Sequence, residues 1–184
     1  MNINIIVAYC QNNGIGYNNL LPWNIRSDLK KFRNLTTGKG NNALIMGKNT
    51  YNSILNINNN SLKHRDSLIL STTLEIDDIN ETNNIIKSFN NIQNLENFIK
   101  TKNYDELWII GGEKIYDYFL NNYPNDGILN PQKIYVTYIN KDFKCDSFFP
   151  IINPLKYKFI SQEIISNIKD DYDFSIINII YTKI

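Results

Sequence analysis

The most constraining feature of the sequence is a change of rhythm near Pro131. Before it, short apolar runs alternate with helix-patterned segments, which is typical of an α/β domain with a parallel sheet. After it come three long β-rich runs with no helical pattern between them, and short connections of this kind join antiparallel neighbours. The sequence therefore predicts a single α/β domain over residues 1–184. We expect a central, mostly parallel, eight-stranded twisted sheet with antiparallel strands at its C-terminal edge and about four flanking helices.

Runs of β-branched and apolar residues predict the strands, and apolar residues at helical spacing predict the helices. The expected strands cover residues 3–9, 42–46, 67–70, 85–89, 106–110, 133–140, 157–165 and 172–182. The expected helices cover residues 26–36, 47–54, 95–102 and 113–121. Ligands of open α/β sheets bind at the carboxyl ends of the strands, so we expect the motifs that follow those ends to cluster there.

Composition excludes several classes of protein. The 184 residues carry 19 Lys+Arg against 18 Asp+Glu, which argues against a nucleic-acid binder driven by bulk positive charge. No apolar run approaches the roughly 20 residues of a transmembrane helix, and no signal-peptide pattern opens the chain. Cys10 and Cys145 form neither a CxxC pair nor a disulfide framework, which favours free thiols. We therefore expect a cytoplasmic protein without nucleic-acid or membrane partners. We also expect a monomer, because the sequence shows no extra apolar stripe.

Two glycine turns follow predicted strands and open predicted helices. They are Gly111-Gly112 and Gly47-Lys48-Asn49-Thr50. Glycine lets the backbone approach a ligand closely, and a helix N-terminus offers free N–H groups to a phosphate. Taken alone, Gly111-Gly112 is better explained by a tight turn without a ligand, and neither common nucleotide fingerprint is present. Two such turns at one sheet edge suit a nucleotide pyrophosphate better than either turn alone.

Two charged residues are candidates for ligand binding. Asp28 lies beside Leu29 and four residues before Phe32, so it shares a helix face with apolar side chains. An acid in a first helical turn is usually a cap or a partner of the macrodipole, but one that points with an apolar stripe needs another partner. Arg65 is either a solvated loop residue or a fork that binds a carboxylate. His64 is expected to be exposed and non-catalytic, and its surroundings predict no metal site.

Taken in order, these motifs resemble the dihydrofolate reductase family over essentially the whole chain. The matching segments are Ile6-Val7-Ala8, Asn13-Gly14-Ile15-Gly16, Leu21-Pro22-Trp23, Asp28-Leu29 with Phe32, Ile45-Met46-Gly47-Lys48-Asn49-Thr50, Leu62 with Arg65, Leu70-Ser71, Trp108-Ile109-Ile110-Gly111-Gly112, Ile115-Tyr116, Val136-Thr137 and Asp146-Ser147-Phe148-Phe149-Pro150. The resemblance implies NADPH-dependent reduction of 7,8-dihydrofolate to 5,6,7,8-tetrahydrofolate. It also implies hydride transfer from the nicotinamide to pterin C6, protonation of N5 through water, and a role in one-carbon and thymidylate metabolism.

The resemblance also implies roles for individual residues. Asp28 matches the pterin-binding acid, and the expected catalytic residues are Asp28, Trp23, Tyr116 and Thr137. The expected substrate-binding residues are Ile6, Val7, Ala8, Asp28, Leu29, Phe32, Ile54, Leu62, Arg65 and Ile110. The expected cofactor-binding residues are Ala8, Ile15, Gly16, Gly47, Lys48, Asn49, Thr50, Ser53, Leu70, Ser71, Thr72, Ile110, Gly111, Gly112, Glu113, Lys114, Ile115 and Tyr116.

Within these sets the resemblance places some contacts more closely. Arg65 would bind the α-carboxylate of the glutamate tail, and Lys48 and Ser71 would contact the 2′-phosphate of the cofactor. The loop from Gly14 to Leu21 resembles a mobile lid. Asp146 matches a position whose carboxylate holds backbone N–H groups of that lid.

Some alternatives remain open. Asn49 and Thr72 stand where many relatives carry basic or imidazole side chains, which weakens the expected preference for NADPH over NADH. Lys48 still favours NADPH. A related reductase of the same fold that acts on a pyrimidine intermediate is disfavoured by Asp28 with Phe32 and Arg65, because that substrate has neither a pterin nor a glutamate tail. A non-catalytic folate-binding or nucleotide-binding protein would bind ligand without oxidising the cofactor.

Overall fold

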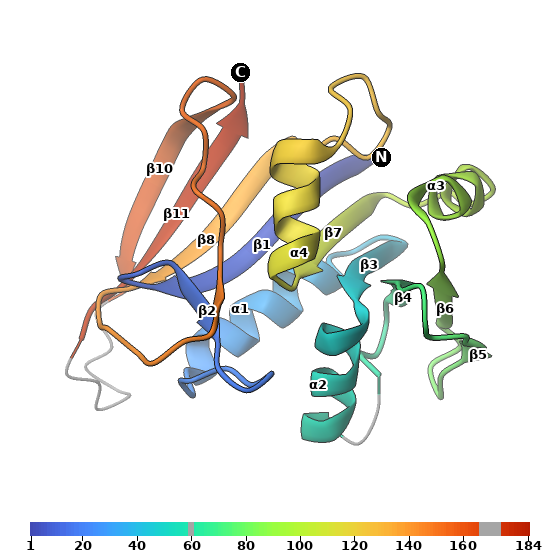
Figure 1. Ribbon diagram of the computed structural model, residues 1–184, viewed down its shortest axis with the longest axis horizontal. Helices are drawn as coiled ribbons and strands as arrows, with labels where there is room; N and C mark the ends of the chain where they lie inside the picture. Colours follow the sequence, from blue (N-terminus) through green and yellow to red (C-terminus); the bar gives the residue numbers. More distant parts are fainter. Residues whose placement is uncertain (59–60, 166–173) are drawn as a thin grey trace.

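A nine-stranded sheet runs through the molecule in the order β10-β11-β8-β1-β7-β3-β4-β6-β5 (Figure 1). The structure is a computed structural model and describes residues 1–58, 61–165 and 174–184. The strands of this sheet are β1 (Asn2–Cys10), β3 (Asn42–Gly47), β4 (Asp66–Leu70), β5 (Asp77–Ile79), β6 (Ile85–Phe89), β7 (Glu106–Gly111), β8 (Lys133–Ile139), β10 (Tyr157–Ile165) and β11 (Ile176–Lys183). A separate two-stranded sheet pairs β2 (Gly14–Gly16) with β9 (Ser147–Phe148). The helices are α1 (Arg26–Thr37), α2 (Lys48–Asn58), α3 (Ile92–Lys100), α4 (Glu113–Asp117) and the π-helix η1 (Tyr118–Asn122).

The pairing of the strands confirms the predicted fold class. β1 pairs in parallel with β7 and β8, and β3 pairs in parallel with β4 and β7. At the C-terminal edge, β11 lies antiparallel between β8 and β10. The ninth strand, which the sequence did not predict, is β5 at the opposite edge. Its three residues are all exposed, so no apolar pattern marks it.

Two apolar layers cover the sheet because alternate residues of a strand face opposite sides. On one side, Ile3, Ile5 and Val7 of β1 pack with residues of α3, α4 and η1. On the other side, Ile6 of β1 and Trp108 of β7 pack with residues of α1 and α2. This second side, with α1 lying along it, is where most of the predicted substrate-binding side chains gather.

Several element boundaries differ from the sequence-based expectation. Helix α3 begins at Ile92 because the Asn91 side chain accepts a hydrogen bond from the Asn94 N–H and caps the helix. The helix expected over 113–121 is present but changes from α to π winding at Tyr118. The last strand was expected to begin at residue 172, which lies outside the described residues. Within the described part of the chain, no helix is long and apolar enough to cross a membrane.

Candidate active site

The acid of the candidate site, Asp28, lies in the first turn of α1 and is half-buried. It does not cap the helix, because the N-cap position is Ile25. The Thr137 hydroxyl on β8 and the Lys31 ammonium both lie near enough to the Asp28 carboxylate to stabilise its charge. Burial raises the pKa of the Asp28 carboxyl above its ordinary value, and Thr137 and Lys31 lower it in part. Asp28 and Thr137, both predicted from the sequence, therefore lie together in the structure.

Two aromatic residues of the predicted catalytic set, Trp23 and Tyr116, are buried in different apolar clusters. The Trp23 ring lies edge-on to Phe143, with 5.5 Å between centroids, and its Nε1–H has no acceptor among the described residues. The Tyr116 hydroxyl donates to the Ile6 carbonyl at 2.8 Å. Burial, with a smaller contribution from the Asp28 charge, raises the pKa of Tyr116 far above its ordinary value. Tyr116 is therefore a neutral hydrogen-bond donor at physiological pH.

An apolar surface extends from this acid between α1 and α2. Five of the predicted substrate-binding residues belong to its cluster: Ile6, Phe32, Ile54, Leu62 and Ile110. Two others differ from this group. Val7 faces the opposite side of the sheet, so only its main chain is directed to this region. Leu29 remains 48% exposed, although its spacing placed it on the apolar stripe of α1.

Arg65 lies beyond the apolar surface and is only 3% exposed, which excludes the solvated-loop interpretation. Its Nη1 donates to Thr36 Oγ1 at 2.7 Å and to the Arg33 carbonyl at 3.4 Å, while Nε has no partner. The guanidinium carbon lies 5.9 Å from the centre of the Phe32 ring. Burial, helped by the nearby Arg33 charge, lowers the pKa of Arg65 to about 10. The guanidinium is therefore charged at neutral pH and keeps unused hydrogen-bonding capacity.

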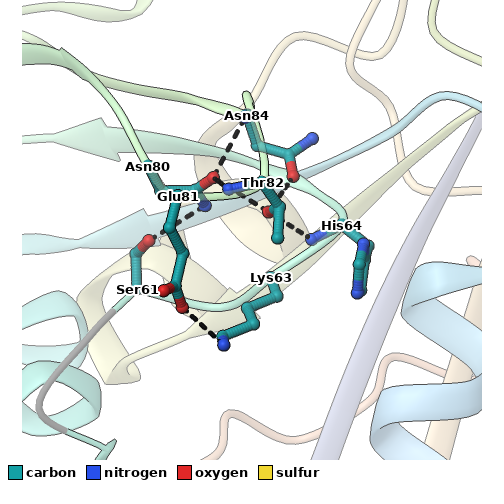
Figure 2. Close-up of polar contacts among 7 residues, drawn as sticks. All are labelled: Ser61, Lys63, His64, Asn80, Glu81, Thr82 and Asn84. Atoms are coloured by element: carbon teal, nitrogen blue, oxygen red, sulfur yellow. Dashed lines mark hydrogen bonds and ion pairs between the residues drawn. The ribbon is translucent and has the colours of Figure 1, made fainter.

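A polar cluster braces the segment that carries Leu62 and Arg65 (Figure 2). The buried Asn80 side chain donates to Ser61 Oγ at 3.1 Å, and its Oδ1 accepts from both the N–H and the hydroxyl of Thr82. The His64 N–H donates to Thr82 Oγ1 at 3.2 Å. The His64 side chain is exposed, as expected. No local pattern in the sequence indicates this cluster, because the pairing of β4 with β6 brings its two loops together.

The two glycine turns meet at the same edge of the sheet, as predicted. A Cβ atom on Gly47 would lie 3.2 Å from Ile115, and one on Gly112 would lie 3.3 Å from Thr50 Oγ1. Gly111 has φ of +105°, and a Cβ there would lie 2.7 Å from the Tyr116 ring. The Gly111–Gly112 peptide bond is cis. The turns form a backbone surface that side chains on these glycines would obstruct, which fits a bound pyrophosphate.

The predicted 2′-phosphate residues, Lys48 and Ser71, lie at the start of α2 and directly after β4. Lys48 Nζ, at the start of α2, donates to Thr73 Oγ1 at 3.0 Å. Ser71 Oγ accepts from the backbone N–H groups of Thr73 and Leu74. Asn49 and Thr72 are exposed. The remaining predicted cofactor residues are placed as follows: Ala8 in β1, Ile15 and Gly16 in β2, Ser53 in α2, Leu70 at the end of β4, and Glu113 and Lys114 exposed in α4.

The loop that resembles a lid is tied down by an acid, as the resemblance implies. Asp146 Oδ2 accepts a hydrogen bond from the Asn18 N–H at 2.8 Å, and the Asp146 N–H donates to the Gly16 carbonyl. On the other side of this small sheet, Glu113 Oε2 accepts from the Phe148 N–H at 3.1 Å. The lid is thus connected to the glycine turn through α4.

A mostly parallel α/β sheet with two glycine turns at the carboxyl ends of its strands is typical of proteins that bind their ligands at that edge. Residues 2–181 match the family model described as dihydrofolate reductase. The dihydrofolate reductase of Sus scrofa is 36% identical over 167 residues, covering 87% of this chain and 85% of the relative. That of Heliothis virescens is 32% identical over 169 residues, covering 88% and 85%. That of Buchnera aphidicola subsp. Baizongia pistaciae is 33% identical over 185 residues, covering 100% and 99%. The chain belongs to the dihydrofolate reductase family and is therefore an oxidoreductase.

Proposed function

We propose that the protein reduces 7,8-dihydrofolate to 5,6,7,8-tetrahydrofolate with hydride from NADPH. The observation that carries this proposal is the half-buried Asp28 carboxylate, held by Thr137 beside an apolar surface. A carboxylate in this setting favours a ligand that presents N–H donors on an apolar ring, which describes a pterin. In the proposed complex, the two oxygens of Asp28 accept from the ring N–H and the 2-amino group.

The other end of the site would bind the rest of the substrate, which is the aminobenzoate ring and the glutamate tail. The aminobenzoate ring would pack against Phe32, Ile54 and Leu62, which belong to one apolar cluster. The α-carboxylate of the glutamate tail would bind Arg65, whose buried guanidinium has a free Nε. Charge-assisted hydrogen bonds of this kind are among the stronger polar interactions in proteins.

When bound, the cofactor supplies the hydride, and the protein positions the reactants and the proton. Asp28 would hold the pterin and stabilise its N5-protonated form. Because Asp28 binds the amino side of the ring, the proton would reach N5 through water. The buried Trp23 N–H, which has no acceptor among the described residues, suits a contact with such a water.

The preference for NADPH rests on Lys48. Its ammonium lies beside the Ser71–Thr73 turn, bonded to Thr73 Oγ1. Lys48 would provide the positive charge for a 2′-phosphate, whereas the neutral Asn49 and Thr72 would add none. We further propose that the protein is a cytoplasmic monomer that supplies tetrahydrofolate for one-carbon and thymidylate metabolism.

The test is cofactor oxidation by the purified protein with dihydrofolate, using NADPH and NADH side by side. We expect rapid turnover with NADPH and slower turnover with NADH. Comparable rates would show that Lys48 and Ser71 do not discriminate between the cofactors. Folded protein that turned over neither cofactor would contradict the proposed activity.

A further inference from the structure

A row of polar side chains crosses three adjacent strands beneath α1. The strand register places Thr137 of β8 opposite Asn178 of β11, and Asn178 opposite Glu163 of β10. The neighbours of Thr137 and Asn178 in the sequence, Val136 and Ile179, pack on the other side of the sheet. The row therefore faces α1, which carries Asp28.

Lys31 of α1 reaches into this row. Its Nζ lies 2.6 Å from Asn178 Oδ1 and 3.2 Å from Thr137 Oγ1. The side chain is half-buried, and both of its acceptors are neutral oxygens. Lys31 thus donates to the same hydroxyl that stabilises the Asp28 carboxylate.

The chemistry of Lys31, Thr137 and Asp28 limits the directions that their hydrogen bonds can take. An ammonium only donates and a carboxylate only accepts, whereas a hydroxyl has one hydrogen and two acceptor positions. The Thr137 hydrogen has two acceptors within reach, Asp28 and Asn178 Oδ1, the latter at 3.4 Å. Because Lys31 donates to both Asn178 Oδ1 and Thr137 Oγ1, it favours the arrangement in which Thr137 donates to Asp28.

We propose that Lys31 is a positioning residue, which directs the Thr137 hydroxyl toward Asp28 and keeps Asp28 as the carboxylate that binds the substrate. The inference rests on the proposed role of Asp28 as the substrate-binding acid. Lys31 acts through Thr137 and through its own charge and needs no contact with the ligand.

The electrostatics of the cluster agree with this role. Burial raises the pKa of Asp28, and the Lys31 charge opposes that rise. Burial lowers the pKa of Lys31, and the charges of Asp28 and of the exposed Glu163 oppose that fall. The other groups that face Asp28 from the sheet and from α4 are the neutral Thr137 and Tyr116. Lys31 is thus the cation that acts on Asp28 among these groups.

The most direct test is the titration of the Asp28 carboxyl carbon by NMR in protein labelled with ¹³C at the aspartate carboxyl. The Asp28→Asn variant assigns the signal. In Lys31→Met, which keeps much of the side-chain volume without the charge, we expect the midpoint to shift to higher pH. In Lys31→Arg, which keeps the charge, we expect a midpoint near that of the unmodified protein. The matched control is Lys30→Met, because Lys30 is the exposed neighbour on the same helix and its loss removes the same charge.

Three results would overturn the proposal. They are an unchanged Asp28 midpoint in Lys31→Met, an equal shift in Lys30→Met, or a shift in Lys31→Arg as large as in Lys31→Met. The last result would assign the effect to packing alone. Thermal melting of each variant checks that the protein is folded.

A second readout links the cluster to turnover. If Asp28 is the substrate-binding acid, the midpoint of the pH profile of kcat/KM should move in Lys31→Met in the same direction as the NMR midpoint. An NMR shift without a matching kinetic shift would count against the role of Asp28 in the proposed function, while leaving the link between Lys31 and Asp28 intact. The two failures are therefore distinguishable.

Discussion

The two charged residues at the ends of the candidate site, Asp28 and Arg65, have different partners within the chain. Asp28 is half-buried, and two groups of the chain, the Thr137 hydroxyl and the Lys31 ammonium, partly stabilise its charge. Arg65 is 3% exposed, and its hydrogen bonds go only to neutral oxygens of Thr36 and Arg33. The two ion pairs found among the described residues both lie elsewhere.

This difference indicates which ligand groups would stabilise the charges of Asp28 and Arg65. A buried charge is costly unless it is paired and hydrogen-bonded. Thr137 and Lys31 offset part of the cost of burying the Asp28 charge, and N–H groups of a ligand would offset more of it. Arg65 has no anionic partner in the described part of the chain, and the carboxylate of the substrate tail would supply one.

The largest effect is expected at the acid end. The Asp28→Asn variant should fold and bind cofactor but lose about 10²–10⁴-fold in turnover at neutral pH, the range typical of a catalytic acid or base. The loss should be smaller in acid, where the substrate can take its proton from solvent. Steady-state rates between pH 5 and 8 measure this, with Asp126→Asn, an exposed loop acid, as the control. Undiminished turnover at neutral pH would remove Asp28 from its proposed role.

At the other end, Arg65→Leu should act mainly on substrate binding. Hydrogen bonds to a charged group contribute about 1.5–3 kcal/mol, so KM for dihydrofolate should rise roughly tenfold to a hundredfold with little change in kcat. A dihydropterin without the glutamate should be affected much less. The exposed Arg26 provides the matched control as Arg26→Leu. An equal effect of Arg65→Leu on both substrates would refute the carboxylate contact.

A smaller effect is expected at the residue that orients Arg65. Thr36→Val removes the hydroxyl that accepts from Arg65 Nη1 at 2.7 Å. A buried N–H left without its acceptor costs about 1–3 kcal/mol, so denaturant titration should show a loss of that size together with a few-fold rise in KM. The control is Thr37→Val, because the Thr37 hydroxyl is buried without a partner and its loss should be neutral or stabilising. Equal effects of the two variants would show that Thr36 does not orient Arg65.

The smallest effect concerns the pH dependence of stability. Burial raises the pKa of Asp28, so between its ordinary and raised values the folded protein binds more protons than the unfolded chain. Stability then falls as pH rises through this window, and the cost stays constant above it. Asp28→Asn should remove this slope and raise the melting temperature at neutral pH, by about 2–4 °C for each kcal/mol regained. If the melting temperatures of the two proteins changed equally with pH across this window, the result would contradict the pKa shift.

The sequence predicted the parts of the site that depend on local patterns. Asp28 was recognised because its spacing from Phe32 placed an acid among apolar residues. The glycine turns were recognised because each follows an apolar strand. Both features are present in the structure, and the apolar cluster around Phe32 includes five of the ten predicted substrate-binding residues.

The sequence did not predict the parts that depend on strand register or long-range contacts. Lys31 is half-buried only because Asn178, 147 positions away, lies opposite Thr137 in the sheet. The burial of Arg65 depends on the last turn of α1, which brings Thr36 to it. The small sheet of β2 and β9 has three and two residues in its strands, too few to show a period. Only the i, i+3 spacing of Asp28 and Lys31 was a local signal that could have been used.

The most direct test of the account is a double-mutant cycle on dihydrofolate binding. Dissociation constants would be measured for the unmodified protein, Asp28→Asn, Arg65→Leu and the double variant. Asp28 and Arg65 share no hydrogen-bond partner among the described residues, so the losses in binding free energy should add if one ligand contacts both ends. A double variant that binds no more weakly than the weaker single variant would contradict the claim that dihydrofolate spans the site from Asp28 to Arg65.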